Sequence, residues 1–130
     1  QPDLAVAVDV TFASAPGTPD HKSYPMGEGI PLGWGPSVHP GLYRAFKKAA
    51  EEEDISVNRE PLPMRSGTDA DVLQISAAGV PTMVLSIPLR YMHTPVEIVH
   101  KEDIRAVAKL SQALIDRLDA NFLSTLEWEE

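Results

Sequence analysis

The longest apolar run of the chain, residues 80–89 with the sequence VPTMVLSIPL, constrains its fold more than any other feature. The run contains two prolines and is far shorter than the roughly 20 residues that a membrane-crossing helix needs, so we predict no membrane span. A short apolar run rich in β-branched residues is instead typical of a strand buried inside a sheet.

Strand and helix patterns alternate along the rest of the chain. Residues 4–12 (LAVAVDVTF) show little polar alternation and predict a central strand, while residues 13–29 predict a long loop. Further strands are expected in residues 30–38 and 55–63. Helices are expected in residues 40–54, in residues 69–79, closed by a glycine, and in residues 101–126. This order predicts one domain with an α/β layered sheet.

The charge balance and the missing cysteines exclude several classes of function. Nineteen acidic and eleven basic residues give a net charge of -8, which repels phosphate backbones, so nucleic acid is not an expected partner. The chain has no cysteine, which rules out disulfides, thiolate zinc sites and a cysteine nucleophile. Any metal ion would therefore be bound by histidine and carboxylate side chains.

Two side chains of this type are expected near the carboxyl ends of strands, where layered α/β sheets bind their ligands. Asp9 lies in an otherwise apolar strand, so its carboxylate must be hydrogen-bonded, neutralised or bound to a cation. His93 follows the most apolar strand, and imidazole is the commonest metal ligand. Asp9 could instead cap a turn, and His93 could be a core histidine bonded to a backbone carbonyl. Together the two favour a metal site.

The segment SGTDAD, residues 66–71, offers a second kind of site. Gly67 and Thr68 could lie at a helix amino terminus, whose free N–H groups would hold a carbonyl oxygen or carboxylate of a substrate. Capping of that helix by Thr68 or Asp69 explains the same residues without any ligand. Asp69 and Asp71 are two positions apart and point to different sides of a helix, which makes them a poor acid/base couple.

The remaining histidines and serines carry weaker signals. His21 is expected in the long loop, His39 precedes a helix-starting proline and His100 precedes the last helix, so all three are interpreted as structural or exposed. Ser66 and Ser86 have no visible base, which a serine nucleophile requires within hydrogen-bond reach.

Four segments, in chain order, resemble the carboxyl-terminal part of metallopeptidase family 42: AVAVDVTFA, GWGPSVHP, SGTDADVLQISAAGVPT and VLSIPLRYMHTPVEIV. These enzymes are dinuclear-metal aminopeptidases of the deblocking, glutamyl and tetrahedral types, and some members are labelled endoglucanase or cellulase. The resemblance runs through nearly all of the chain.

The resemblance implies a three-layer α/β/α sandwich around a mixed, mostly parallel sheet, with two divalent metal ions, zinc or cobalt. Asp9 matches the aspartate of the family's Asp-Val-Thr motif and His93 the histidine of its Arg-Tyr-Met-His motif. They are expected to be terminal ligands of different ions. Gly67, Thr68 and Asp69 match Gly-Thr-Asp-Ala and are expected to contact the substrate. The family's other ligands and its catalytic glutamate come earlier in the chain, so no catalytic residue is expected here.

Residues 1–130 are therefore interpreted as the carboxyl-terminal segment of a metalloaminopeptidase catalytic domain, without its amino-terminal part and inserted assembly domain. The complete protein is expected to remove amino-terminal residues from peptides in the cytoplasm as a homo-oligomer. The isolated segment is expected to bind metal partially or not at all and to be inactive. A non-catalytic fragment or assembly module is the alternative. An endoglucanase ranks third, because glycoside hydrolysis needs a carboxyl pair and no convincing pair is visible.

Overall fold

Strands and helices alternate along the chain in the computed structural model, which describes residues 2–126 and 128. The strands are β1 (Ala5–Phe12), β2 (Ile30–Trp34), β3 (Val57–Pro61), β4 (Thr82–Arg90) and β5 (Ile98–Val99). The helices are α1 (Pro40–Glu52), α2 (Ala70–Leu73) and α3 (Lys101–Ile115), and the short 3-10 turns are η1 (Asp20–Lys22) and η2 (Phe122–Thr125).

The strands form one mixed sheet in the order β1-β4-β2-β3, with β5 paired to the end of β4. The two longer pairings, β1 with β4 and β2 with β3, are parallel, whereas β2 and β5 run antiparallel to β4. In the parallel register Asp9 lies opposite Ser86, so both side chains project from the same face of the sheet.

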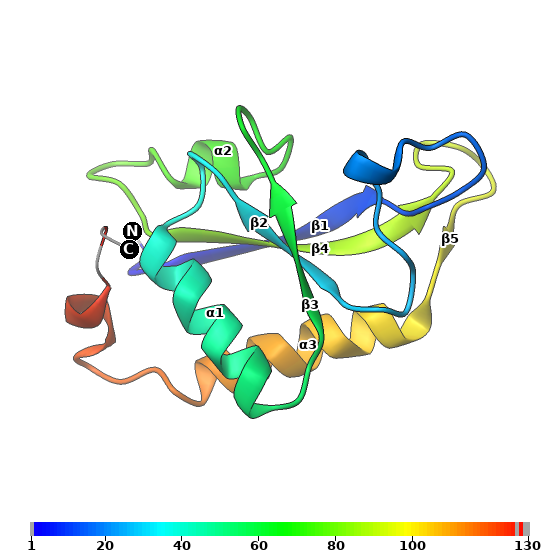
Figure 1. Ribbon diagram of the computed structural model, residues 1–130. Helices are drawn as coiled ribbons and strands as arrows, with labels where there is room; N and C mark the ends of the chain where they lie inside the picture. The colour runs from blue at the N-terminus through cyan, green and yellow to red at the C-terminus, as the bar shows by residue number, and fades with distance from the viewer. Residues whose placement is uncertain (1, 127, 129–130) are drawn as a thin grey trace.

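Helices cover both faces of this sheet (Figure 1), with α2 above it and α1 and α3 below. The lower layer holds most of the apolar core. There the sheet contributes Ile30, Leu32, Met83 and Leu85, and the helices contribute Leu42, Phe46, Val107, Leu110 and Leu114, all buried. The expected three-layer α/β/α arrangement with a mixed sheet is confirmed.

The predicted central position of residues 4–12 is wrong within the described residues, because β1 is the edge strand of the sheet. Its run of alanine and valine was interpreted as a sign of cover on both faces. Instead Ala7 and Thr11 are buried, while Val8, Val10 and Phe12 on the opposite face are exposed. The apolar pattern therefore marks a face that the described residues leave open.

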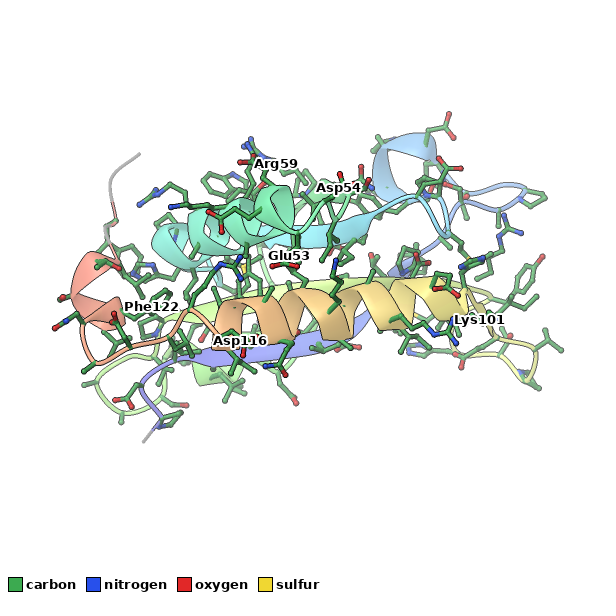
Figure 2. The ribbon with its side chains drawn as sticks, turned by 90° about the horizontal axis from the view of Figure 1, so that it is seen from below. Glu53, Asp54, Arg59, Lys101, Asp116 and Phe122 are labelled. Atoms are coloured by element: carbon green, nitrogen blue, oxygen red, sulfur yellow. The ribbon has the colours of Figure 1, made fainter. Side chains whose placement is uncertain are left out.

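The last two predicted helices end earlier than the sequence indicates. The helix of residues 101–126 stops at Ile115, and the chain turns where the Asn121 N–H donates to the Asp119 carboxylate at 2.8 Å, a local bond that competes with helix. Figure 2 shows Phe122 beyond the helix end that Asp116 marks. The helix of residues 69–79 shrinks to α2, since Ala77 and Gly79 have positive φ angles that an α-helix excludes. Within residues 2–126 and 128, no helix combines the length and apolarity that a membrane span requires.

Candidate functional site

A cleft on the α2 side of the sheet collects most of the residues that the sequence singled out. Side chains from β1, β4 and the end of β3 form its floor, and the segments around residues 21–24, 63–68 and 92–93 form its walls. Its polar lining comprises Asp9, Thr11, His21, Lys22, Tyr24, Glu60, Ser66, Thr68, Ser86 and His93. Asp9 and His93, 84 positions apart in the sequence, thus line the same cleft, as the metal hypothesis requires.

Asp9 lies in the middle of β1 and not at its carboxyl end, so the predicted strand-end position is corrected. Its side chain is half-buried, and its Oδ1 accepts the N–H of Val10 at 2.7 Å. The turn-capping alternative fails because no turn follows Asp9. A carboxylate with one backbone hydrogen bond keeps acceptor capacity for a cation, since two carboxylate oxygens offer about four lone-pair sites.

His93 lies in the turn that follows β4 and is exposed, so it is not a core histidine. Its φ angle of 64° lies in the left-handed region, and the turn is closed by Thr94, whose N–H and hydroxyl both donate to the Tyr91 carbonyl. The His93 N–H donates to the Glu97 carboxylate at 2.6 Å. Among the described residues no group hydrogen-bonds the imidazole, which leaves its nitrogens available to a ligand.

The donor types fit zinc or cobalt, but their number does not complete a site. Imidazole nitrogen and carboxylate oxygen are ordinary ligands of these ions, and a catalytic zinc ion takes about three protein ligands. In the part of the chain that the structure describes, no three His, Asp or Glu side chains gather closely enough to hold a metal ion.

Glu60, a residue that the sequence analysis did not single out, is buried in the floor of the cleft. The Ser86 hydroxyl of β4 donates to its Oε2 at 2.5 Å, across the intervening strand β2. Burial, and secondarily the negative charge of Glu60, raises the pKa of the nearby Tyr24 hydroxyl to about 12. Ser86 is only 2% exposed, so a substrate carbonyl cannot reach its oxygen, and we interpret the pair as structural.

Asp71 fixes the segment of residues 66–68 against the cleft. Its carboxylate accepts hydrogen bonds from the Ser66 N–H and hydroxyl at 2.8 Å each, from the Gly67 N–H at 3.1 Å and from the Ser37 hydroxyl at 2.8 Å. Burial alone would raise the pKa of Asp71, but these bonds outweigh it and lower the pKa to about 2.

These bonds also change the interpretation of the predicted substrate-binding residues. Gly67 and Thr68 line the cleft, whereas Asp69 is not among its lining residues. The N–H groups of Gly67 and Thr68 already donate to Asp71 and Ser66. Thr68 Oγ1 accepts the Ala70 N–H at 3.2 Å, which agrees with the capping alternative. Helix α2 is a single turn, and these hydrogen bonds favour capping over ligand binding, the other interpretation of this segment.

Two of the three remaining histidines are helix caps, as a structural interpretation requires. The Nδ1 atoms of His39 and His100 accept the N–H groups of Gly41 and Glu102, at the starts of α1 and α3. Burial, and secondarily the charge of Arg44, lowers the pKa of His39. His21 is exposed in η1 and lines the cleft.

Comparison with known proteins gives consistent matches. The sequence pattern of the family described as M42 glutamyl aminopeptidase matches residues 1–110. A lysyl aminopeptidase of Pyrococcus furiosus is 39% identical over 117 residues, which cover 90% of this chain and 34% of that protein. The chain therefore spans about a third of the length of this relative.

Solved structures agree with the sequence matches. The crystal structure of a TET aminopeptidase from a marine sediment archaeon, Thaumarchaeota archaeon SCGC AB-539-E09, superposes on this chain with a TM-score of 0.88 at 27% sequence identity. The matched region is 97% of this chain and 36% of the chain in that crystal structure. The TET1 peptidase of Pyrococcus horikoshii, described as assembling into a tetrahedron or a large octahedral shell, superposes with a TM-score of 0.68 at 29% sequence identity. The matched region is 87% of this chain and 33% of the chain of that peptidase.

Proposed function

The chain belongs to the M42 glutamyl aminopeptidase family, and from this membership we propose that it forms the carboxyl-terminal part of a metal-dependent aminopeptidase. The complete enzyme would release amino-terminal residues from peptides. One observation carries the proposal: Asp9 and His93, the two residues that match the family's ligand motifs, line one cleft.

We assign Asp9 and His93 as ligands of two different divalent ions, zinc or cobalt. Such a pair of ions would polarise the scissile carbonyl as Lewis acids. Asp9 presents its carboxylate from a rigid strand, and the turn of residues 91–94 presents the imidazole of His93. The buried Glu60–Ser86 pair fixes the floor between β3 and β4.

Gly67 and Thr68 are proposed to shape the substrate side of the cleft. Because Ser66 and Asp71 already accept their N–H groups, they would contact a peptide by shape and through carbonyl oxygens instead of N–H donors. Asp69 stays a candidate for contact with a longer substrate, since its side chain is exposed and forms no cap hydrogen bond.

The proposal is tested with a chimera in which residues 1–130 replace the matched third of the P. furiosus relative. With added zinc or cobalt, the chimera should hydrolyse lysyl, leucyl or glutamyl p-nitroanilide, and the isolated chain should not. Asp9→Asn and His93→Ala should each lower kcat/KM at least about 100-fold and reduce the bound metal measured by mass spectrometry. Asp3→Asn, an exposed carboxylate outside the cleft, is the matched control.

Two outcomes would contradict the assignment. A chimera with Asp9→Asn that keeps full activity and metal content would show that Asp9 is not a ligand. Turnover by the isolated chain that depends on metal and disappears in His93→Ala would show that this segment does not need the rest of the enzyme.

A second candidate, a non-catalytic assembly or binding module, is favoured by the shortage of metal donors within residues 2–126 and 128. A folded chimera that binds metal without turnover would support it. A glycosidase is disfavoured, because Glu60 shares the cleft with Asp9 but is buried and bonded to Ser86. For the complete enzyme we propose peptide substrates, the cytoplasm that the family resemblance implies, and a homo-oligomer, as its P. horikoshii relative is described to form.

A further inference from the structure

The loop that carries His93 connects two paired strands. β5 pairs antiparallel with the end of β4, and residues 91–97 form the loop between them. All residues of this loop except Met92 are exposed, so packing against the core does little to fix their conformation. Local hydrogen bonds therefore determine the direction in which the loop presents the imidazole of His93.

The backbone of this loop is strained at two residues. Tyr91 has a φ of 58° and His93 a φ of 64°, and both values lie in the left-handed region. In that region the Cβ atom of an L-residue comes close to a backbone carbonyl oxygen, and only glycine adopts it freely. A residue with a large side chain keeps such a conformation where its surroundings compensate the strain. The loop therefore needs contacts that hold Tyr91 and His93 in place.

Two side chains of the loop supply these contacts. Thr94 closes the turn at Tyr91, because its N–H and its hydroxyl both donate to the Tyr91 carbonyl, at 3.2 and 2.6 Å. Glu97 acts on His93 itself, since its Oε1 atom accepts the His93 N–H at 2.6 Å. A hydrogen bond from an N–H group to a charged carboxylate is shorter and stronger than one between neutral groups. The Glu97 side chain therefore restrains the backbone of His93 directly.

Glu97 has no competing role in the described part of the chain. It is exposed, and among residues 2–126 and 128 it pairs with no cation. It is also not among the residues that line the cleft, whereas His93 is. The hydrogen bond to the His93 N–H is thus the contact through which Glu97 affects the cleft.

We propose that Glu97 is a positioning residue for His93: its carboxylate holds the His93 backbone in the left-handed conformation that directs the imidazole toward the cleft. Without this bond, rotation of φ into the ordinary negative range would redirect the Cα–Cβ bond of His93 and the imidazole with it. The inference rests on the proposed function, in which His93 is a metal ligand. It adds the side chain that keeps this ligand in position before any metal binds.

Amide exchange of the isolated chain without metal, measured by NMR, tests the contact. In Glu97→Ala the His93 amide should exchange at least about 10-fold faster than in wild type. Glu97→Gln keeps an acceptor oxygen, so its His93 amide should exchange within about threefold of wild type. Glu28→Ala removes an exposed carboxylate outside the cleft and should leave this exchange unchanged. Because both glutamates are exposed, all three variants should melt within a few degrees of wild type.

The metal affinity of the chimera defined above tests the consequence for the site. Removal of a group that orients a metal ligand typically weakens metal binding 10–100-fold, so Glu97→Ala should raise the Kd for cobalt about 10-fold or more. Glu97→Gln should raise this Kd less than about threefold, because its amide oxygen still accepts the His93 N–H. Competition with a chelator of known cobalt affinity measures both values. The Tm of the metal-free chimera should stay the same, which separates positioning of His93 from a general loss of stability.

Three results would overturn the proposal. One is unchanged exchange of the His93 amide in Glu97→Ala. Another is an unchanged cobalt Kd of Glu97→Ala in a chimera whose Kd rises with His93→Ala. The third is an equal rise of the Kd in Glu97→Gln and Glu97→Ala, because the charge of Glu97, and not its hydrogen bond to His93, would then act on the metal. A chimera whose metal content is unchanged by His93→Ala would contradict the ligand assignment of the proposed function, and amide exchange would still decide whether Glu97 holds the loop.

Discussion

At the scale of single residues, Asp71 shows how a hydrogen-bonded carboxylate can hold one wall of a cleft in place. It is the only acceptor that joins Ser37, Ser66 and Gly67 among the described residues, and those bonds place residues 66–68 in the cleft wall. The lowered pKa means that the folded state prefers the charged form of this side chain more than the unfolded state does.

Asp71→Asn should therefore destabilise the chain in a pH-dependent way. The pKa of Asp71 is about 2 in the folded state and ordinarily 3.8, so its stabilisation is fully present above about pH 4 and is lost as the pH falls through 2. After allowance for solvent screening, we expect a loss of about 1 kcal/mol in the free energy of unfolding at pH 7. Urea unfolding at pH 7 and pH 3 measures it, and the gap at pH 3 should be about half as large.

Asp69→Asn is the matched control, since Asp69 is two positions away and makes no cap hydrogen bond. A gap between Asp71→Asn and wild type that stays constant from pH 7 to pH 3 would show that the charge of Asp71 does not stabilise the fold.

The sequence located Asp9 and His93 because each breaks a local apolar pattern, and such a break is visible without a partner. It did not reveal the roles of Glu60 and Asp71. Their partners Ser86 and Ser37 are 26 and 34 positions away, and only the folded sheet brings them into contact. Local patterns therefore identify residues of unusual environment but not networks that depend on tertiary contacts.

At the scale of elements, α3 is held at its start by a contact with a distant loop. Asp103 in the first turn is 3% exposed, and its two carboxylate oxygens accept the Gly27 N–H at 2.9 and 3.0 Å. A negative charge in the first turn also interacts favourably with the helix dipole. Gly27 has a φ of 78°, so the loop presents its N–H in a conformation that glycine tolerates well.

Asp103→Ala should lower the free energy of unfolding by about 2 kcal/mol, because it leaves the Gly27 N–H without its partner and removes the favourable charge. Glu102→Ala is the control in the same turn, and we expect it to cost under about 1 kcal/mol, since Glu102 pairs with Arg105 on the exposed surface. Thermal and urea unfolding of both variants measure the difference. Equal losses would indicate that only the dipole interaction matters.

Helical periodicity predicted the start of α1 at Pro40 well, because a helix start depends on nearby residues. Prediction failed where distant contacts decide. A Cβ at Gly35 would lie 1.9 Å from the Leu62 carbonyl oxygen, a close approach that no local pattern reveals. The edge position of β1 was not predicted for a similar reason. An apolar strand shows the same sequence pattern whether or not the described residues cover both of its faces.

At the scale of the whole molecule, net charge and the apolar edge strand β1, with its exposed Val8, Val10 and Phe12, act in opposite directions on self-association. A charge of -8 at pH 7 keeps copies apart, while an open apolar strand edge attracts them. Acidification toward the pI of about 4.9 removes the repulsion and leaves the edge.

We therefore expect the isolated chain to be monomeric at pH 7.5 and to associate into open-ended assemblies near its pI. Static light scattering across this pH range measures the transition. Val8→Lys/Val10→Lys should suppress association even at the pH where that variant carries no net charge, because lysines on an edge strand block edge-to-edge pairing. Met64→Lys/Val96→Lys has the same added charge and hence the same pI, and it should still associate at that pH. Similar scattering from both variants would show that net charge, and not the apolar edge of β1, controls self-association of this chain.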